Sequence, residues 1–279
     1  MVENVMGEEV ISMEKMNWST GELLTMIDLC GYSTTAEGMG ESIYPNRTKF
    51  FWGDFFEKSV ESLIAKEYLS KEKYTEGDNP LTPKLQQFIE EYMQAKRVIR
   101  AAKRGTDETF IIRELGDGTW MRESIISKEA LHRFDFSDHL DLKQELKEFY
   151  QYAPTSPQVY ASSFQITDAQ FAMLNQKRNG RSVRDEASFS TEERASFDHF
   201  IKDLKKKNGV LNSISLLRFE PEYNELHLEK VIFHLPSDEG VWVIHYQNAE
   251  TVHVSLQISN EWLHMIDFTS YMIGGGDVV

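Results

Sequence analysis

Hydrophobic residues recur at helical spacing through the first third of the chain. Ser19 and Glu22 have the spacing of a capping box, and the apolar residues that follow them predict a helix over 20–30. An aromatic cluster at 50–56 leads into a second amphipathic segment, which also predicts a helix. Pro83, at a first helical position, begins a third helix of about three turns. The pattern therefore predicts a helical beginning.

The period of the pattern changes near Val98, where strands replace helices. Apolar runs at 110–112 and 120–121 flank a glycine-rich turn, which predicts a tight hairpin. Helical spacing then returns over 127–134 and again over 140–152. We therefore expect a hairpin followed by two helical segments.

A proline-rich segment at 153–157 marks the boundary between two halves of the chain. Its two prolines in four residues disfavour both a helix and a central strand. The N-terminal half, 1–152, is predicted to contain helices and then a β-hairpin and a helix. The C-terminal half, 153–279, is predicted to contain helices, a four-stranded antiparallel sheet and a terminal helix. We expect the two halves to form one globular unit.

The C-terminal half begins with further helix signals. Capping-box spacings at 167–170 and 190–193 predict two helices, and the polar stretch 175–186 between them is predicted to be an exposed loop. Four strands joined by short polar turns follow, and a last helix ends the pattern. The predicted ranges are 214–219, 226–235, 241–246 and 251–258 for the strands and 259–272 for the helix.

An internal repeat relates the two halves. Setting residue n beside residue n+132 without a gap pairs 110–112 with 242–244, and 126–136 with 258–268. The second pair of segments shares Ile, Ser, Glu, Leu, His, Asp and Phe at matching positions, so polar residues match as well as apolar ones. Duplication is the favoured interpretation. The predicted fold class is α+β, with two pseudo-twofold-related halves that each pack an antiparallel β-hairpin or sheet against helices.

Composition restricts the classes of function. The 279 residues include 45 acidic and 30 basic side chains, and the formal net charge of -15 repels nucleic acid and anionic lipid. We therefore expect neither nucleic acid nor a membrane as a partner. No apolar run is long enough to cross a bilayer, and the acidic start lacks the pattern of a signal peptide. The expected location is cytoplasmic, and the oligomeric state stays open.

The sequence offers few groups for catalysis. Cys30 is the only cysteine, which excludes an internal disulfide and a zinc site built on several thiolates. The glycine-rich stretches lack phosphate-binding spacing, and no nucleophile elbow occurs. We therefore expect no enzyme, no catalytic residue and no cofactor.

Two His/Asp pairs raise the alternative of a metal site. His132 with Asp135, and His264 with Asp267, stand three residues apart, which would place each pair on one face of a helix. Imidazole and carboxylate ligands suit zinc, manganese or iron, so a metal-dependent enzyme is one alternative. The favoured interpretation is that both pairs make local hydrogen bonds and that no metal is bound.

The order of elements resembles a known family. A helix over 55–69, a second helix opened by Leu81-Thr82-Pro83-Lys84-Leu85, a strand, a hairpin and a helix precede a second half of similar plan. This order, over about 55–137 and 210–272, is similar to that of the EspG family of type VII (ESX) secretion. The resemblance implies a distant member of that family that serves a Gram-positive system.

The resemblance also implies a function and a partner. Members of the EspG family are cytosolic, non-enzymatic chaperones with two quasi-symmetric α+β halves, and they hold secreted helical-hairpin substrates before export. Their client-contacting loop between the second and third strands is usually extended, whereas this chain has only a short turn there. Client contacts must therefore be shorter at this position or lie elsewhere. The partner-binding residues implied by the resemblance are Leu115, Gly116, Asp117, Gly118 and Trp120.

Two further interpretations of the first half stay open. The three helices, the strand pair and a basic stripe at 96–104 would also suit a winged-helix DNA-binding transcriptional regulator. The helix over 54–69 argues against it, because its acidic residues make a poor surface for phosphates. The aromatic cluster at 50–56 is either an exposed docking patch or part of the core, and the core is favoured.

Overall fold

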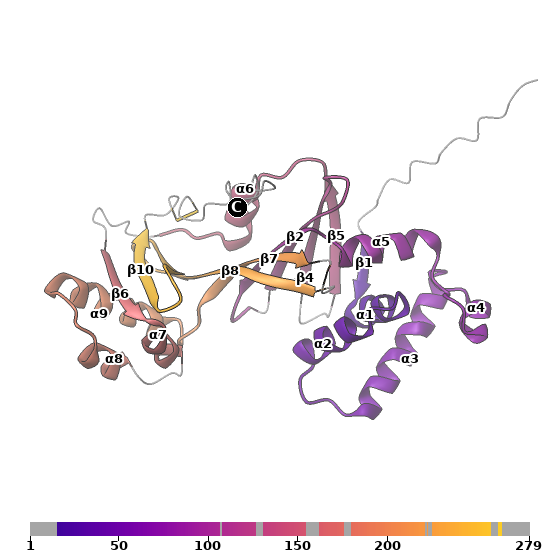
Figure 1. The fold of residues 1–279 in the computed structure, drawn as a ribbon, viewed down its shortest axis with the longest axis horizontal. Coiled ribbons are helices and arrows are strands. Elements are labelled where there is room, and N and C mark those ends of the chain that lie inside the picture. Colours follow the sequence, from indigo (N-terminus) through magenta and orange to yellow (C-terminus); the bar gives the residue numbers. More distant parts are fainter. Residues whose placement is uncertain are drawn as a thin grey trace, which may run out of the picture. The chain divides into compact units, whose positions relative to one another are not determined.

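The fold is α+β, with helices packed against an antiparallel sheet (Figure 1). A computed structural model describes residues 16–106, 108–126, 131–154, 162–175, 180–220, 222, 225–257 and 262–263. The chain divides into two compact units. Unit 1 comprises 1–98, 110–140 and 219–225, and unit 2 comprises 99–109, 141–218 and 226–279.

Unit 1 begins with a short strand that runs directly into a capped helix. β1 (Met16–Ser19) leads into α1 (Thr20–Leu29), and the predicted capping box is confirmed. The Ser19 hydroxyl accepts a hydrogen bond from the Glu22 amide at 3.2 Å, and the Glu22 carboxylate accepts one from the Ser19 amide at 2.9 Å. α2 (Ser33–Ile43) follows, in a stretch rich in glycine, serine and threonine where the sequence pattern predicts no helix.

Three further helices complete the helical part of unit 1. α3 (Lys49–Ala65) contains the predicted amphipathic segment, α4 (Lys71–Glu76) is a short turn-like helix, and α5 (Pro83–Met93) begins at proline as predicted. Glu22 ties α1 to α3, because its carboxylate accepts a hydrogen bond from the Ser62 hydroxyl at 2.7 Å. The apolar faces of these helices pack on one core.

Strands then replace helices, as the sequence predicts. β2 (Arg97–Lys103), β3 (Glu108–Glu114) and β4 (Trp120–Ile126) are followed by β5 (Leu131–Ser137). The last of these corrects the helix predicted over 127–134, of which 127–130 lie outside the described residues. Its buried positions alternate, so that His132 and Phe134 face inward. A buried histidine hides the period of two in the sequence, because imidazole counts as polar in a hydrophobicity pattern.

Aromatic rings form the centre of the unit 1 core. Trp18 of β1 packs edge-on against Phe88 of α5 at 4.8 Å between ring centroids, and its ring lies 5.1 Å from that of Phe134 in β5. All three side chains are buried. The first strand is therefore held both by its pairing with β5 and by the rings between sheet and helix.

From residue 141 on, unit 2 continues with helices around a second short strand. Its elements are α6 (Leu142–Tyr150), β6 (Ser162–Thr167), α7 (Asp168–Asn175), α8 (Gly180–Glu186) and α9 (Thr191–Lys206). The capping boxes predicted for α7 and α9 are confirmed. The loop predicted over 175–186 is wrong for 180–186, which form α8. One fully buried apolar residue, Val183, anchors this otherwise polar helix.

The four strands predicted in the C-terminal half are confirmed. They are β7 (Asn212–Glu220), β8 (Glu225–Pro236), β9 (Val241–Tyr246) and β10 (Thr251–Gln257). The core against α7–α9 includes Phe197 and Phe200 of α9 and Trp242 of β9. The ten described strands follow the order β1-β5-β4-β3-β2-β7-β8-β9-β10-β6.

The repeat at n+132 does not follow these elements. It pairs β3, the second strand of its four-strand run, with β9, the third strand of the other run. It also pairs Leu131, in strand β5, with Leu263, in a turn. Most of 258–268 and the predicted helix over 259–272 lie outside the described residues. The n+132 register therefore does not pair strands that hold the same place in their own four-strand runs.

Candidate functional site

The predicted partner-binding residues lie at the hairpin turn between β3 and β4. The Leu115 amide donates a hydrogen bond to the Thr119 carbonyl at 2.9 Å, and the Gly118 amide donates one to the Leu115 carbonyl at 3.1 Å. Gly118 has a φ of 89°, which explains glycine at this position. Asp117 accepts a hydrogen bond from the Thr119 amide at 2.8 Å. These hydrogen bonds within the turn fix its conformation.

Only part of this turn is open to a partner. Leu115 is buried and belongs to the unit 1 core, whereas Gly116, Asp117 and Gly118 are exposed and Trp120 is half-buried. The hydrogen bond from the Thr119 backbone lowers the pKa of the Asp117 carboxyl, which therefore stays ionised in mildly acidic solution. The turn presents one carboxylate and little apolar area.

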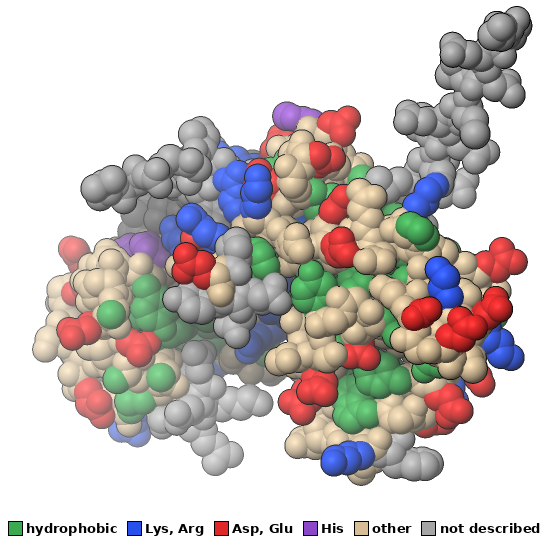
Figure 2. All heavy atoms as spheres, turned by 45° about the vertical axis from the view of Figure 1, so that its right-hand side comes forward, with side chains coloured by type: hydrophobic (Ala, Val, Ile, Leu, Met, Phe, Trp, Pro, Cys, Tyr) green, Lys and Arg blue, Asp and Glu red, His purple; other side chains and the backbone are tan. Residues whose placement is uncertain are grey.

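A larger apolar surface lies at the start of α3. Five aromatic side chains there, none of them fully buried, contact one another with ring centroids between 5.3 and 6.3 Å apart. Figure 2 shows hydrophobic side chains gathered at the height of α2 and the start of α3, with acidic side chains beside them. We call this set the aromatic surface: Tyr44, Phe51, Trp52, Phe55 and Phe56.

Two glycines determine how the aromatic surface is built. A Cβ atom at Gly21 of α1 would lie 2.3 Å from the Ser59 hydroxyl and 3.2 Å from the Phe55 ring. A Cβ atom at Gly40 of α2 would lie 2.7 Å from the Trp52 ring. The glycines therefore let α3 approach both helices closely. The Trp52 ring packs against Gly40 and the Phe55 ring packs against Gly21. Phe51 and Phe56 have no such glycine contact.

Charged side chains border the aromatic surface. The Arg47 guanidinium lies 5.0 Å from the centroid of the Phe51 ring, and Asp54 and Lys58 form an exposed ion pair at 2.8 Å. Glu57 and Glu61 are exposed on the same helix. An apolar centre with a charged border is the usual composition of a protein–protein contact surface. The sequence favoured a core position for the cluster at 50–56. The structure leaves the rings of Phe51, Trp52, Phe55 and Phe56 part-exposed, and the side chain of Phe50 lies outside what it describes.

A buried polar network lies inside unit 1. The His132 Nδ1 atom is 2.7 Å from Glu123 Oε1, and its Nε2 atom is 3.0 Å from the Thr20 hydroxyl. Glu123 also accepts a hydrogen bond from the Tyr92 hydroxyl at 3.2 Å and faces the Arg113 guanidinium at 3.6 Å. Burial opposes ionisation of Glu123, but its partners outweigh it and lower the pKa of its carboxyl. All five side chains are buried, so the network serves the fold.

The metal alternative based on His132 and Asp135 is wrong in its geometry. The two residues lie on a strand, where positions three apart face opposite sides of the sheet. Asp135 is exposed and pairs with Arg122 at 2.7 Å. His264 and Asp267 lie outside the described residues. The described part of the chain contains no group of three or more His, Cys, Asp or Glu side chains that could hold a metal ion.

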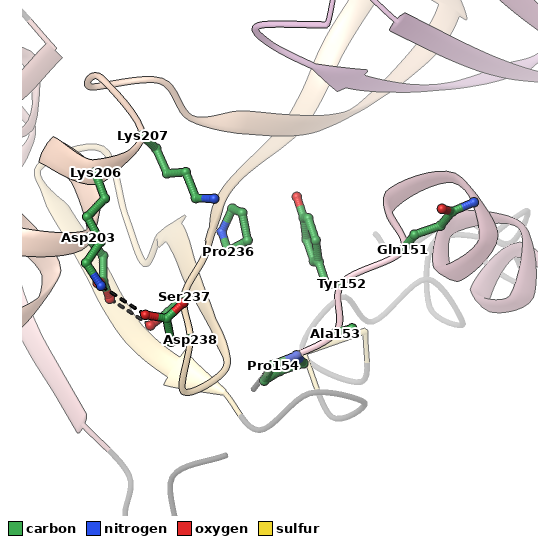
Figure 3. Close-up of a pocket in the computed structure, with 10 residues that line it drawn as sticks. All are labelled: Gln151, Tyr152, Ala153, Pro154, Asp203, Lys206, Lys207, Pro236, Ser237 and Asp238. Atoms are coloured by element: carbon green, nitrogen blue, oxygen red, sulfur yellow. Dashed lines mark hydrogen bonds and ion pairs between the residues drawn. The ribbon is translucent and has the colours of Figure 1, made fainter. Parts of the chain in front are cut away.

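A cavity of about 310 Å³ lies within unit 2 (Figure 3). The segment after α6, the end of α9 and the turn after β8 supply its lining. Tyr152 is committed to the fold, because its hydroxyl lies 2.9 Å from His234 Nδ1 and accepts a hydrogen bond from Asn212. The lining residues are Gln151, Tyr152, Ala153, Pro154, Asp203, Lys206, Lys207, Pro236, Ser237 and Asp238.

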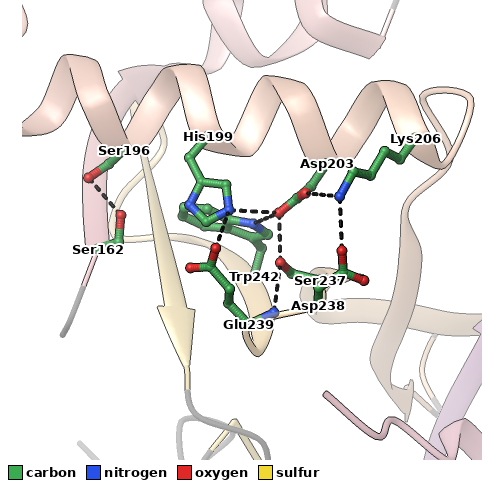
Figure 4. Close-up of polar contacts among 9 residues, drawn as sticks. All are labelled: Ser162, Ser196, His199, Asp203, Lys206, Ser237, Asp238, Glu239 and Trp242. Carbon is green, nitrogen blue, oxygen red and sulfur yellow. Dashed lines mark hydrogen bonds and ion pairs between the residues drawn. The ribbon is translucent and has the colours of Figure 1, made fainter. Parts of the chain in front are cut away.

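The carboxylate of Asp203 in this cavity wall is likewise committed (Figure 4). It accepts hydrogen bonds from the Trp242 indole at 3.0 Å and from the Ser237 hydroxyl at 2.7 Å. His199 and Lys206 approach it at 3.3 and 3.7 Å. Both hydrogen bonds end on Oδ2, so this oxygen is held by buried donors of the fold. Asp203 thus ties α9 to β9 and to the turn after β8.

The basic stripe at 96–104 is partly neutralised. Arg97 pairs with Glu114 across β2 and β3, and Lys103 pairs with Glu108 at 3.0 Å. Paired cations release fewer counterions from a nucleic acid. This arrangement weakens the winged-helix interpretation. No described helix is long and apolar enough to span a membrane.

One comparison with known proteins decides the family. The family described as "Uncharacterised protein YfjC" matches residues 37–266, which is well over half of the chain. The chain belongs to the YfjC family. No curated protein matches it.

The YfjC match includes the aromatic surface and the hairpin turn of unit 1. The aromatic surface begins at Tyr44 and the hairpin turn ends at Trp120, both inside the matched range. The match also includes the cavity of unit 2. Sequence reasoning missed Tyr44 and Gly40, because their roles depend on α2, a helix that the pattern did not predict. It missed Gly21 because the role of this residue depends on the packing of α1 on α3.

Proposed function

We propose that this YfjC-family protein is a non-enzymatic, cytoplasmic chaperone or adaptor that binds a type VII secretion substrate before export, as EspG-like proteins do. The observation that carries the proposal is the aromatic surface on α3. Aromatic side chains dominate the energetics of protein contacts, and a part-exposed cluster of five is a preformed place for an apolar helix face.

The order of elements supports an EspG-like plan. In the N-terminal half of the chain, a short strand and helices precede four strands, and β1 pairs with the last of these, β5. In the C-terminal half, β6 and helices precede four strands, and β6 pairs with the last of these, β10. We infer that the two halves are related by duplication with an approximate twofold axis. The corresponding strands are then β2 with β7 through β5 with β10, and not the pairs of the n+132 register.

The hairpin turn is a secondary contact in this proposal. Gly116, Asp117 and Gly118 present one carboxylate at the position of the EspG client loop, and Trp120 stands beside them half-buried. A turn of this size contacts one or two side chains of a client. The larger share of the contact therefore falls to the aromatic surface.

The experiment compares what wild-type protein and two variants retain from their native cytoplasm. Phe51→Ala combined with Phe56→Ala removes two rings without touching the glycine contacts of Trp52 and Phe55. Tyr74→Ala is the matched control, since Tyr74 is a 45% exposed aromatic residue on α4 outside the surface. Eluates are treated with nuclease, washed with salt and analysed by mass spectrometry.

The expected result is that wild type and Tyr74→Ala retain small helical secretion substrates, whereas the double variant loses them by at least about tenfold. Equal retention by all three proteins would show that the aromatic surface is not the client site. Recovery of DNA alone, with an affinity that falls steeply with salt, would reject the chaperone and favour the winged-helix regulator.

A further inference from the structure

Two histidines face each other across neighbouring strands of unit 2. His245 of β9 and His253 of β10 are directly opposite in the antiparallel register. Directly opposite residues point to the same side of a sheet, with Cβ atoms about 5 Å apart. Neither residue belongs to the core that packs against α7–α9, so both lie on the opposite face of these strands. Both side chains are half-buried.

The spacing of the two rings suits a shared ligand. Their centroids are 5.2 Å apart and the ring planes are inclined by 56°. With metal–nitrogen bonds of about 2.1 Å, two imidazoles bound at a tetrahedral angle have centroids about 5 Å apart. The observed separation of the ring centroids matches this geometry.

Both imidazoles are available as ligands. Burial lowers the pKa of each ring below its usual 6.5, and the neighbouring His253 and Lys230 lower that of His245 further. Neutral imidazole is the form that binds metal. Within the described residues, no group hydrogen-bonds the buried His253 Nδ1 atom. Nδ1 of His253 is thus not committed to a partner in the described part of the chain, whereas both ring nitrogens of His132 and Nδ1 of His234 are.

We propose that His245 and His253 together bind a divalent transition-metal ion such as Zn²⁺, Ni²⁺ or Cu²⁺. Imidazole nitrogen suits these ions, and water completes their coordination when a protein supplies only two ligands. Gln165 of β6 is the register partner of His253 on its other side. Its amide nitrogen donates a hydrogen bond to the Gln247 side-chain oxygen at 3.3 Å. This site is independent of the proposed client site in unit 1.

A neighbouring cation gives the proposal a sharp test. Lys230 is close enough to act electrostatically on His245, so it also repels a bound metal ion. The variant Lys230→Gln removes this repulsion without touching either ligand. It should strengthen metal binding, an effect that a purely structural role of the histidines does not produce.

The experiment titrates untagged full-length protein with ZnCl₂, NiCl₂ and CuCl₂ at pH 7.5 by calorimetry. We expect one ion per chain and the tightest binding for Cu²⁺, as nitrogen ligands require. His245→Gln and His253→Gln should each weaken binding by at least about tenfold, whereas Lys230→Gln should strengthen it severalfold. His139→Gln is the matched control, because His139 is exposed and far from His245 and His253 in sequence, and it should leave metal binding unchanged.

Two results would overturn the proposal. One is the absence of saturable binding at one ion per chain by any of the three metals. The other is binding that His245→Gln and His253→Gln leave unchanged, or that His139→Gln weakens equally, which would place the metal elsewhere. Circular dichroism of each variant without metal, compared with that of wild type, shows whether the fold is intact.

Discussion

The two units bury their polar groups in different ways. In unit 1, Glu123 has no exposed surface and lies between His132 and Arg113, which are buried with it. In unit 2, the buried Asp203 accepts hydrogen bonds from neutral donors such as Trp242, and its cationic neighbour Lys206 reaches solvent. Loss of a buried charge is costly when its partner stays buried and charged. The comparison therefore predicts that removing the buried carboxylate destabilises the protein more in unit 1 than in unit 2.

The largest expected effect is at Glu123. Glu123→Ala leaves the Arg113 guanidinium, 6% exposed, without its carboxylate. Removing one partner of a buried ion pair costs about 3–5 kcal/mol. Urea denaturation followed by circular dichroism should show this loss in the free energy of unfolding.

A paired replacement separates charge from packing at this site. Glu123→Leu combined with Arg113→Met removes both charges and should recover part of the lost stability, because a well-packed apolar pair can replace a buried ion pair. A loss below about 1 kcal/mol for Glu123→Ala would show that Arg113 finds solvent in the folded protein. The difference between the units would then disappear.

The second prediction concerns acid, which should weaken unit 2 first. Burial lowers the pKa of His234 from 6.5 to about 3, so the folded state keeps this imidazole neutral where the unfolded state protonates it. The unfolded state binds more protons between these two values, and stability falls as the pH falls below 6.5. The loss is about 1.4 kcal/mol per pH unit, or about 2 kcal/mol between pH 7 and pH 5.

Glu123 should change the stability of the protein only at a lower pH than His234 does. Its pKa is lowered in the folded state, so its contribution is complete above the usual value of 4.5 and is lost only as the pH falls through the lower folded value. Between pH 7 and pH 5, the change should therefore come from His234, with smaller contributions of the same sign from His245 and His253. His234→Gln should flatten the dependence of the unfolding free energy on pH in this range. An unchanged slope would assign it to other groups.

Local signals in the sequence predicted the helix ends and most strands. The capping boxes at Ser19 and Ser190 and the proline at the start of α5 depend on residues within one turn, and a single sequence contains all of that information. The four strands β7–β10 followed from apolar runs between polar turns. Elements of this kind need no knowledge of distant contacts.

Elements that depend on distant contacts were not predicted. β5 was expected to be helical, because its buried His132 is polar in sequence and finds its partners in α1 and β4. α8 was expected to be a loop, because one buried valine secures it. Four members of the aromatic surface were predicted as part of a cluster, but their exposure depends on how α1 and α2 pack through Gly21 and Gly40. Burial of polar groups and exposure of apolar ones are properties of packing, which the pattern alone does not contain.

The smallest expected effect is at Asp203. It tests directly whether the two buried carboxylates differ in what their loss costs. Asp203→Asn keeps an oxygen in the position of Oδ2, where the indole of Trp242 and the hydroxyl of Ser237 donate. The new amide replaces Oδ1, which faces only Lys206 at 3.7 Å, and Lys206 already has Asp238 at 3.0 Å as a second partner. The loss should therefore be about 1 kcal/mol, the net worth of one hydrogen bond.

Lys206→Ala is the matched test of the cation at the same site. Its ammonium is exposed, and surface ion pairs contribute little to folding, so its removal should leave the urea midpoint unchanged within error. If Asp203→Asn destabilises the protein as much as Glu123→Ala does, the negative charge of Asp203 is itself required. A carboxylate buried among neutral donors and surface cations would then be as costly to neutralise as one buried in the ionic cluster of unit 1.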